Sequence, residues 1–173
     1  MAAGFEAIEA AEDFGLDISR HRSRRLEPGW LALKRREVDK GLILVASDPS
    51  QLRDYVDLDP LDADTRAAIN ASWPGPQTWI VPASSRAPRW ITGAHDGIAV
   101  RVSAHPGVAA LCAAFGHALV STSANLASHA APRMRAELDP RIVAGVDAVL
   151  AGETSGLAQP TPIRDARSGK SVR

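Results

Sequence analysis

Short apolar runs alternate with longer amphipathic or polar stretches along this chain, and this alternation predicts strands separated by helices. The runs are bounded by turn-forming residues, as in strands that are covered on both faces. Buried strands are predicted at Gly41–Ala46, Thr78–Val81, Gly97–Val102 and Ala118–Ser121. Weaker strand patterns lie at Asp147–Leu150, Ile163–Asp165 and Ser171–Arg173. The pattern therefore indicates an α/β fold with a sheet of mixed strand direction.

Helical spacing or helix-start signals mark the segments between these runs. Alanine and glutamate with apolar residues at helical spacing predict a helix over Gly4–Phe14, ended near Gly15. Asp48-Pro49-Ser50 can cap and open a helix that reaches about Val56. Further helices are predicted at Leu61–Ser72, Gly107–Phe115 and Pro132–Leu138, with one or two helical turns at Trp30–Arg36.

Composition supports a globular protein with a sizeable core. The chain has 173 residues, of which 45% are hydrophobic and 23% charged, and this balance excludes a disordered or fibrous chain. Cys112 is the single cysteine and lies in an apolar run, which fits a buried thiol in a reducing compartment. The sequence shows no apolar stretch long enough to span a bilayer and no signal peptide, so we expect a soluble, cytoplasmic protein.

The charges balance overall but are unevenly placed. Twenty basic residues match twenty acidic ones, which gives no case for general attraction to nucleic acid or membrane. Seven of the basic residues fall between positions 20 and 36: Arg20, Arg22, Arg24, Arg25, Lys34, Arg35 and Arg36. This local excess favours an anionic ligand, with a solvated basic face as the alternative.

Two further features carry candidate chemistry. Ser121-Thr122-Ser123-Ala124-Asn125 lies where a buried strand opens into a loop. Its hydroxyls, amide and backbone N–H groups suit a phosphate or nucleotide, although a polar turn would have the same composition. Arg101 stands inside an apolar strand, where an arginine either reaches the rim or is paired.

The sequence offers no metal site of a familiar kind. The five histidines are scattered, and no pair has the spacing of a zinc motif. The phosphate-binding loop of P-loop enzymes, the dinucleotide-binding glycine fingerprint and the nucleophile elbow of α/β hydrolases are also absent. Thus an ATPase of that type, a dehydrogenase and an esterase are unsupported.

Several of these pieces, taken in order, resemble the YrdC/Sua5/TsaC family of threonylcarbamoyl-AMP synthases. The motifs are Lys34-x-Arg36 followed by Val38–Leu44, Trp73-Pro74-Gly75-Pro76-x-Thr78, Ala99–Val102 followed by His105-Pro106, Ser121–Asn125, and the closing segment Pro160–Asp165. The resemblance covers about Leu31–Arg173. We therefore expect an atypical N-terminal segment, residues 1–30, and a YrdC-like domain, residues 31–173.

The resemblance implies a twisted mixed sheet with flanking helices and a concave basic cavity. It implies a nucleotidyltransferase that combines L-threonine, bicarbonate and ATP into threonylcarbamoyl-AMP and pyrophosphate for the threonylcarbamoyl modification of adenosine 37 in tRNA. Lys34 and Arg36 match the family's triphosphate-contacting pair and are the expected catalytic residues. Ser121, Ser123, Asn125 and Arg101 are the expected nucleotide-binding residues. Mg²⁺ is expected to accompany ATP, and tRNA, double-stranded RNA and other proteins of the tRNA modification are expected partners.

The N-terminal segment departs from the family. It contains no counterpart of the strand that ends in Pro-Thr-Glu and helps to hold threonine, so the sequence predicts that this strand is missing. Gly15–Arg24 instead faintly resembles low-molecular-weight tyrosine phosphatases and arsenate reductases, whose catalytic Cys-x5-Arg loop is absent. We expect nucleotide binding to be retained better than threonine binding, and adenylate synthesis to be slow or absent. The alternative is a degenerate domain that binds nucleotide or RNA without catalysis.

Overall fold

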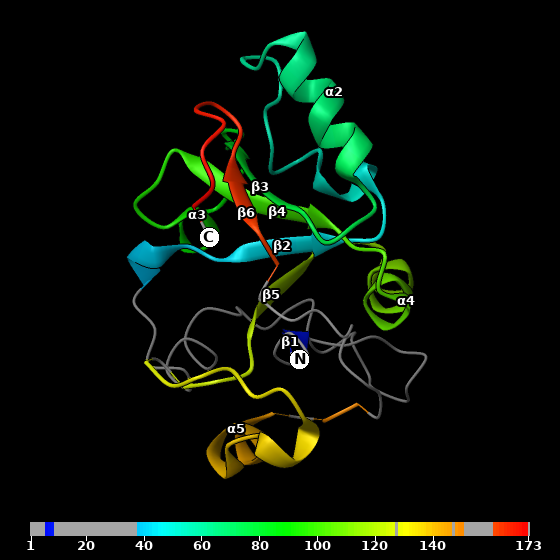
Figure 1. The fold of residues 1–173 in the computed structure, drawn as a ribbon, viewed down its shortest axis with the longest axis vertical. Helices are drawn as coiled ribbons and strands as arrows, with labels where there is room; N and C mark the ends of the chain where they lie inside the picture. The colour runs from blue at the N-terminus through cyan, green and yellow to red at the C-terminus, as the bar shows by residue number, and fades with distance from the viewer. Residues whose placement is uncertain (1–5, 9–37, 127, 147, 151–160, 173) are drawn as a thin grey trace.

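A mixed six-stranded sheet forms the centre of the protein (Figure 1). The structure is a computed structural model, and it describes residues 6–8, 38–126, 128–146, 148–150 and 161–172. The strands are β1 (Glu6–Ile8), β2 (Ile43–Ala46), β3 (Thr78–Pro82), β4 (Gly97–Val102), β5 (Leu119–Ser123) and β6 (Ile163–Asp165). Their order across the sheet is β1-β5-β2-β4-β3-β6. The β2–β4 and β3–β6 pairs are parallel, and the other pairs are antiparallel. This architecture confirms the predicted mixed α/β fold.

Short helices connect the strands. In chain order they are η3 (Val38–Lys40), η4 (Pro49–Leu52), α2 (Ala63–Ser72), α3 (Arg89–Thr92), α4 (Pro106–Phe115), η5 (Arg135–Glu137) and α5 (Pro140–Gly145). In Figure 1, α2 lies at the top beyond β3 and β6, and α5 lies at the bottom beyond β5. None of the helices among the described residues is long and apolar enough to cross a membrane.

Aspartate side chains cap the starts of three of these helices, η4, α2 and α5. The Asp62 carboxylate accepts a hydrogen bond from the Thr65 backbone N–H at 2.8 Å, and this contact starts α2. The Asp48 carboxylate accepts one from the Ser50 N–H at 2.8 Å and starts η4. Both bonds satisfy an N–H that would otherwise lack a partner at the helix start. They also hold the pKa of each carboxyl below its usual value.

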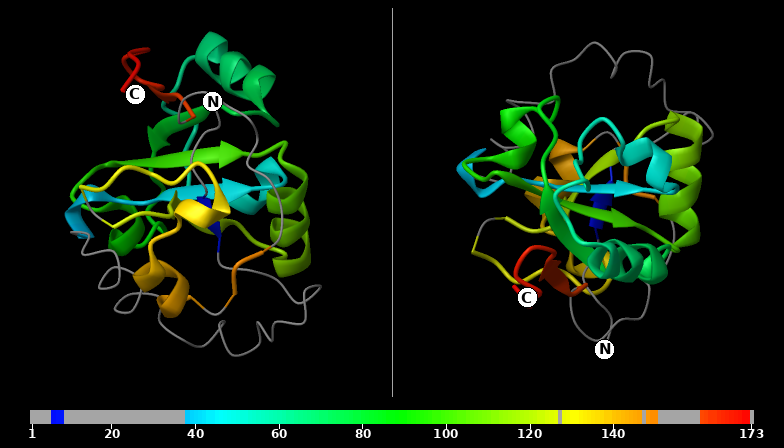
Figure 2. Two further views of the ribbon diagram at one scale, coloured as in Figure 1. Left: turned by 60° about the horizontal axis from the view of Figure 1, so that its bottom comes forward. Right: turned by 90° about the horizontal axis from the view of Figure 1, so that it is seen from above.

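The two faces of the sheet are covered by different elements. Strand alternation sends Leu44, Val100 and Trp79 to one face, where they pack with residues of η4, α2 and α3. On the other face Val45 and Leu119 pack against α4 through Leu111 and Cys112. Figure 2 shows β2 and β4 running side by side between these layers. Because α4 covers only part of its face, the rest of that face is left for other side chains.

Most of the predicted elements are confirmed. The strand at Gly97–Val102 has the predicted bounds, and the other three buried runs each form a strand within a few residues of the expected ends. The helices predicted at Leu61–Ser72 and Gly107–Phe115 correspond to α2 and α4. The closing strand at Ile163–Asp165 is confirmed as β6, and its predicted neighbour forms a single bridge between Arg164 and Ser171.

Other predictions need correction in length or type. The helix expected from Asp48 to Val56 ends as the 3-10 helix η4, since Val56 instead forms a bridge to Ala83. The helix expected at Pro132–Leu138 forms only the short 3-10 helix η5. The helices α5 and α3 were not predicted; α3 lies in the segment between β3 and β4 that was expected to be a loop. No strand forms at residues 148–150. Leu150 packs on the apolar cluster around α4 instead of joining the sheet.

The structure also corrects two expectations for the N-terminal residues. Glu6–Ile8 lie in the segment predicted as a helix, but they form β1, which pairs antiparallel with β5 from Glu6–Ser123 to Ile8–Ser121. A free strand edge can override local helix preference because it offers unpaired N–H and C=O groups. An N-terminal strand is therefore present beside β5, although the sequence lacks the Pro-Thr-Glu motif. The predicted turns at Trp30–Arg36 lie outside the described residues.

A close backbone approach fixes the segment that leads into β2. Gly93, at the end of α3, has φ +68°, and a Cβ at this position would lie 2.4 Å from the Asp39 carbonyl oxygen in η3. The Ala94 N–H donates to the same oxygen at 3.1 Å. Only glycine allows this contact, because any side chain would collide with the backbone of η3. The contact anchors η3, which comes shortly after the basic residues between positions 20 and 36, called the basic segment below.

We expect Gly93→Ala to lower the free energy of unfolding by about 3 kcal/mol or more, because it adds a backbone clash to an unfavourable φ. Gly116→Ala is the matched control, since Gly116 has φ +76° with nothing within 4 Å of a new Cβ. That control should cost only about 1 kcal/mol. Urea unfolding of both variants measures the difference, and equal losses would mean that the Asp39 contact does not constrain η3.

Candidate active site

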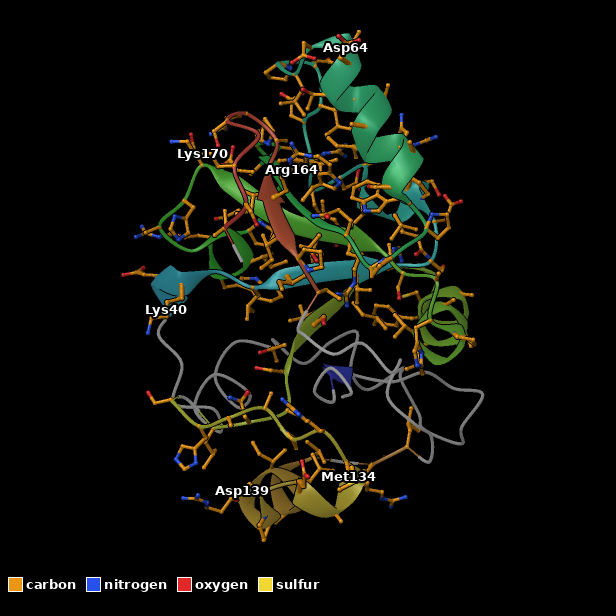
Figure 3. All side chains as sticks on the ribbon, in the orientation of Figure 1. Lys40, Asp64, Met134, Asp139, Arg164 and Lys170 are labelled. Atoms are coloured by element: carbon orange, nitrogen blue, oxygen red, sulfur yellow. The ribbon has the colours of Figure 1, made fainter. Side chains whose placement is uncertain are left out.

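The antiparallel pairing of β5 with β2 brings two predicted polar regions to one edge of the sheet. Ser121 pairs with Ile43, so the carboxyl end of β5 lies beside the amino end of β2. The Ser121–Asn125 motif continues from that end of β5, and η3 precedes β2 at the same edge. Figure 3 shows Lys40 of η3 at this end of β2. The helix η3, which follows the basic segment in the sequence, and the hydroxyl-amide motif therefore share one edge.

Lys34 and Arg36 themselves lie outside the described residues. Their convergence with Ser123 and Asn125 on one surface stays a prediction, as does the concave basic cavity that these residues would line. The division of the chain at residues 30 and 31 also stays a prediction. The topology supports the convergence, because η3 begins only two residues after Arg36.

The register also determines which polar side chains share a face. Ser121 pairs with Ile43, and Ile43 pairs with Ala99 on β4, so these three residues point to the same face. Arg101 is two residues beyond Ala99 and therefore points to that face as well. Two of the predicted site residues, from strands on either side of β2, are thus brought to one face of the sheet.

A row of partly exposed apolar residues crosses the same face beside them. Ile80 on β3 pairs with Ala99 on β4, and Ala99 pairs with Ile43 on β2. All three are intermediate in exposure, whereas most of their strand neighbours are buried. An accessible hydrocarbon row beside a guanidinium and hydroxyls suits a ligand that has both apolar and anionic parts. We call Ile80, Ala99, Ile43, Arg101 and Ser121 the substrate face.

Arg101 is the buried charge of the substrate face. Its side chain is only 3% exposed, and its guanidinium donates a hydrogen bond to the Thr161 hydroxyl at 2.6 Å. Of the two alternatives considered for this arginine, the paired one is therefore confirmed. Thr161 lies two residues before the start of β6. The Thr78 N–H donates to the Pro162 carbonyl at 3.0 Å, which ties this segment to β3. A buried guanidinium without such partners would be strongly destabilising.

The serines and the asparagine of the motif lie in different environments. Ser121 is buried, Asn125 is half-buried and Ser123 is exposed. The Asn125 side-chain amide donates to the His129 carbonyl at 2.5 Å, which folds the loop after β5 back on itself. Among the described residues, the Ser121 hydroxyl and the Asn125 side-chain oxygen find no hydrogen-bond partner although both are buried. Unsatisfied buried polar groups are uncommon in proteins, and each calls for an explanation such as a catalytic role or a bound ion or water.

Cys112 lies in an environment that suits a structural thiol. Burial raises the pKa of the Cys112 thiol to about 11, which keeps it protonated at neutral pH, and the thiol donates weakly to the Val45 carbonyl at 3.5 Å. This environment fits the predicted structural thiol. The described residues contain no cluster of three or more histidine, cysteine, aspartate or glutamate side chains that could hold a metal ion.

Two residues of this region were not predicted as site residues. Thr161 and Thr78 both lie in motifs that the sequence analysis singled out, Pro160–Asp165 and Trp73–Thr78. Their neighbourhood with Arg101 depends on the β3–β4 and β3–β6 pairings, and no signal in the sequence indicates those pairings. Threonines inside otherwise apolar or proline-rich segments were the only hint.

Comparison with known proteins gives the family of this chain. A family model named Sua5/YciO/YrdC, described as telomere recombination, matches residues 30–173. Because the match includes most of the chain, the protein belongs to the Sua5/YciO/YrdC family.

Among characterised relatives, the chain is 62% identical over 143 residues to a threonylcarbamoyl-AMP synthase from Xanthomonas euvesicatoria pv. vesicatoria (strain 85-10). This alignment covers 83% of the chain and 76% of the relative. It is 60% identical over 152 residues to a protein of the same name from Xanthomonas axonopodis pv. citri (strain 306), covering 88% and 81%.

Solved structures agree on the fold. A crystal structure of P. abyssi Sua5 complexed with L-threonine superposes with a TM-score of 0.74 at 21% identity, over 95% of this chain. The chain spans 45% of the length of that protein. E. coli YciO superposes with a TM-score of 0.67 at 22% identity, over 95% of this chain and 74% of YciO.

Proposed function

We propose that this protein is a threonylcarbamoyl-AMP synthase, which joins L-threonine, bicarbonate and ATP and releases pyrophosphate and water. The observation that carries the proposal is about 60% identity to proteins of that name over more than four-fifths of the chain. The substrate face supports it, because it combines a buried guanidinium, hydroxyls and an apolar row. No observation on the described residues favours the non-catalytic alternative.

The proposed chemistry needs positioning and charge neutralisation rather than a protein nucleophile. The threonine amine and bicarbonate form a carbamate, a carbamate oxygen attacks the α-phosphorus of ATP, and pyrophosphate leaves with the bonding electron pair. Cations and hydrogen-bond donors arranged around the phosphates stabilise the charge that develops in such a step. This scheme requires no thiolate nucleophile, which is consistent with the buried and protonated thiol of Cys112.

The residue roles follow from charge and position. In this proposal Lys34 and Arg36 bind the triphosphate, as their match to the family motif suggests. Ser123 and Asn125 line the nucleotide site at the same sheet edge. Arg101 and Ser121 receive an anionic group of the substrates on the substrate face. Mg²⁺ enters with ATP as part of the substrate, since its phosphates supply the oxygen ligands that Mg²⁺ prefers.

The first test of this function is pyrophosphate release by the purified chain. We expect release that requires ATP, L-threonine and bicarbonate together, because the α-phosphorus is attacked only by the carbamate. Omission of any one substrate and replacement of L-threonine by D-threonine are the controls. ATP binding without pyrophosphate release under all of these conditions would support the degenerate domain and contradict the proposal. The concentration of L-threonine required also tests the expectation that threonine binds less well than ATP.

The second test concerns the basic segment. We expect Arg36→Ala to weaken ATP binding by about 1.5–3 kcal/mol, the usual loss for a hydrogen bond to a charged group. Arg35→Ala is the matched control, since it removes the same charge from the adjacent position. That control should cost less than about 1 kcal/mol if position rather than net charge matters. Isothermal titration calorimetry measures both affinities, and equal losses would contradict the assigned role of Arg36.

A further inference from the structure

Thr78 has a buried hydroxyl that the fold does not use. The residue is fully buried at the start of β3, and its backbone N–H and C=O are both bonded, to the Pro162 carbonyl and to the Gln77 side chain. Among the described residues its hydroxyl oxygen finds no hydrogen-bond partner. An unsatisfied buried hydroxyl costs about 1–3 kcal/mol. Valine has nearly the same shape without that cost, so the hydroxyl needs another explanation.

The register places this hydroxyl beside Arg101. Trp79 pairs with Val100, and the next step of the same antiparallel register pairs Thr78 with Arg101. Directly opposed residues have Cβ atoms about 4.5–5.5 Å apart and point to the same face. Thr78 therefore lies on the substrate face, two residues before Ile80 on β3. Because the Thr78 hydroxyl is buried, its hydrogen-bond partner must be a neighbouring protein group or a bound ligand rather than bulk water.

In the structure the Arg101 guanidinium forms a hydrogen bond to Thr161. Its Nη1 donates to the Thr161 hydroxyl at 2.6 Å, on the segment that leads into β6. A guanidinium can donate several hydrogen bonds in a fixed planar arrangement. A small rotation that brings this group toward an anion on the substrate face would offer one of its N–H groups to a new acceptor. The Thr78 hydroxyl is an acceptor at the neighbouring position.

We propose that Thr78 is a positioning residue for Arg101: its hydroxyl accepts a hydrogen bond from the guanidinium when an anionic substrate group is bound, and so fixes the direction of that charge. The inference rests on the proposed function only for the identity of the substrates, which supply a carboxylate or a phosphate group. Thr161 holds the guanidinium in the substrate-free arrangement, and Thr78 holds it in the bound one.

The test compares Thr78→Val, Thr78→Ser and Arg101→Lys by calorimetric titration with ATP and with L-threonine. We expect Arg101→Lys to weaken binding of one of these ligands and Thr78→Val to weaken the same ligand about tenfold, the size expected for a hydrogen bond to a charged group. Thr78→Ser retains the hydroxyl and should restore the affinity. Thr92→Val is the matched control, because Thr92 is a buried threonine of α3 outside the substrate face.

Two further measurements separate positioning from a structural role. Thr78→Val should leave the free energy of unfolding unchanged or raise it, whereas loss of a structural hydrogen bond would lower it. In an Arg101→Lys background Thr78→Val should have little further effect on affinity, since both changes remove one interaction. Wild-type affinity in Thr78→Val, or full additivity of the two changes, would overturn the proposal. Because these readouts are binding constants, failure of the synthase activity would be seen separately in the pyrophosphate assay.

Discussion

The antiparallel pairing of β5 with β2, with Ser121 opposite Ile43, is the constraint on which the rest of the site depends. A parallel β5 would place the Ser121–Asn125 motif at the edge where η4 begins, away from the basic segment. A shift of the register by one residue would turn Ser121 to the opposite face of the sheet, into the core packed by η4, α2 and α3. One strand pairing thus decides both the edge and the face on which the motif acts.

Burial of Arg101 has an energetic consequence for the same region. A guanidinium in a sheet interior loses its hydration, and the bond to Thr161 offsets only part of that cost. The neighbouring buried hydroxyls of Thr78 and Ser121 add to the cost without a partner in the described residues. The apolar clusters on both faces of the sheet must offset this expense. Buried polar groups without partners need an explanation, and in our proposal an anionic substrate group supplies it.

Much of the fold could be predicted because each central strand is a short apolar run between turn residues. The aspartate cap of η4 was equally recognisable in the sequence. The failures have one physical cause: β1, the coil at residues 148–150 and the bridge of Val56 depend on which partner is nearby rather than on local preference. For the site, Arg101 and Ser121 were recognisable as polar residues within apolar strands. Thr78 and Thr161 were not, because only strand pairing brings them to Arg101.

The central claim is that the chain makes an adenylate in which carbon from bicarbonate joins threonine to AMP. Mass spectrometry of the products from ATP, L-threonine and ¹³C-bicarbonate tests it most directly. The account predicts threonylcarbamoyl-AMP that carries one ¹³C atom, formed in step with pyrophosphate. Unlabelled adenylate, or hydrolysis of ATP with no adenylate of threonine, would contradict it.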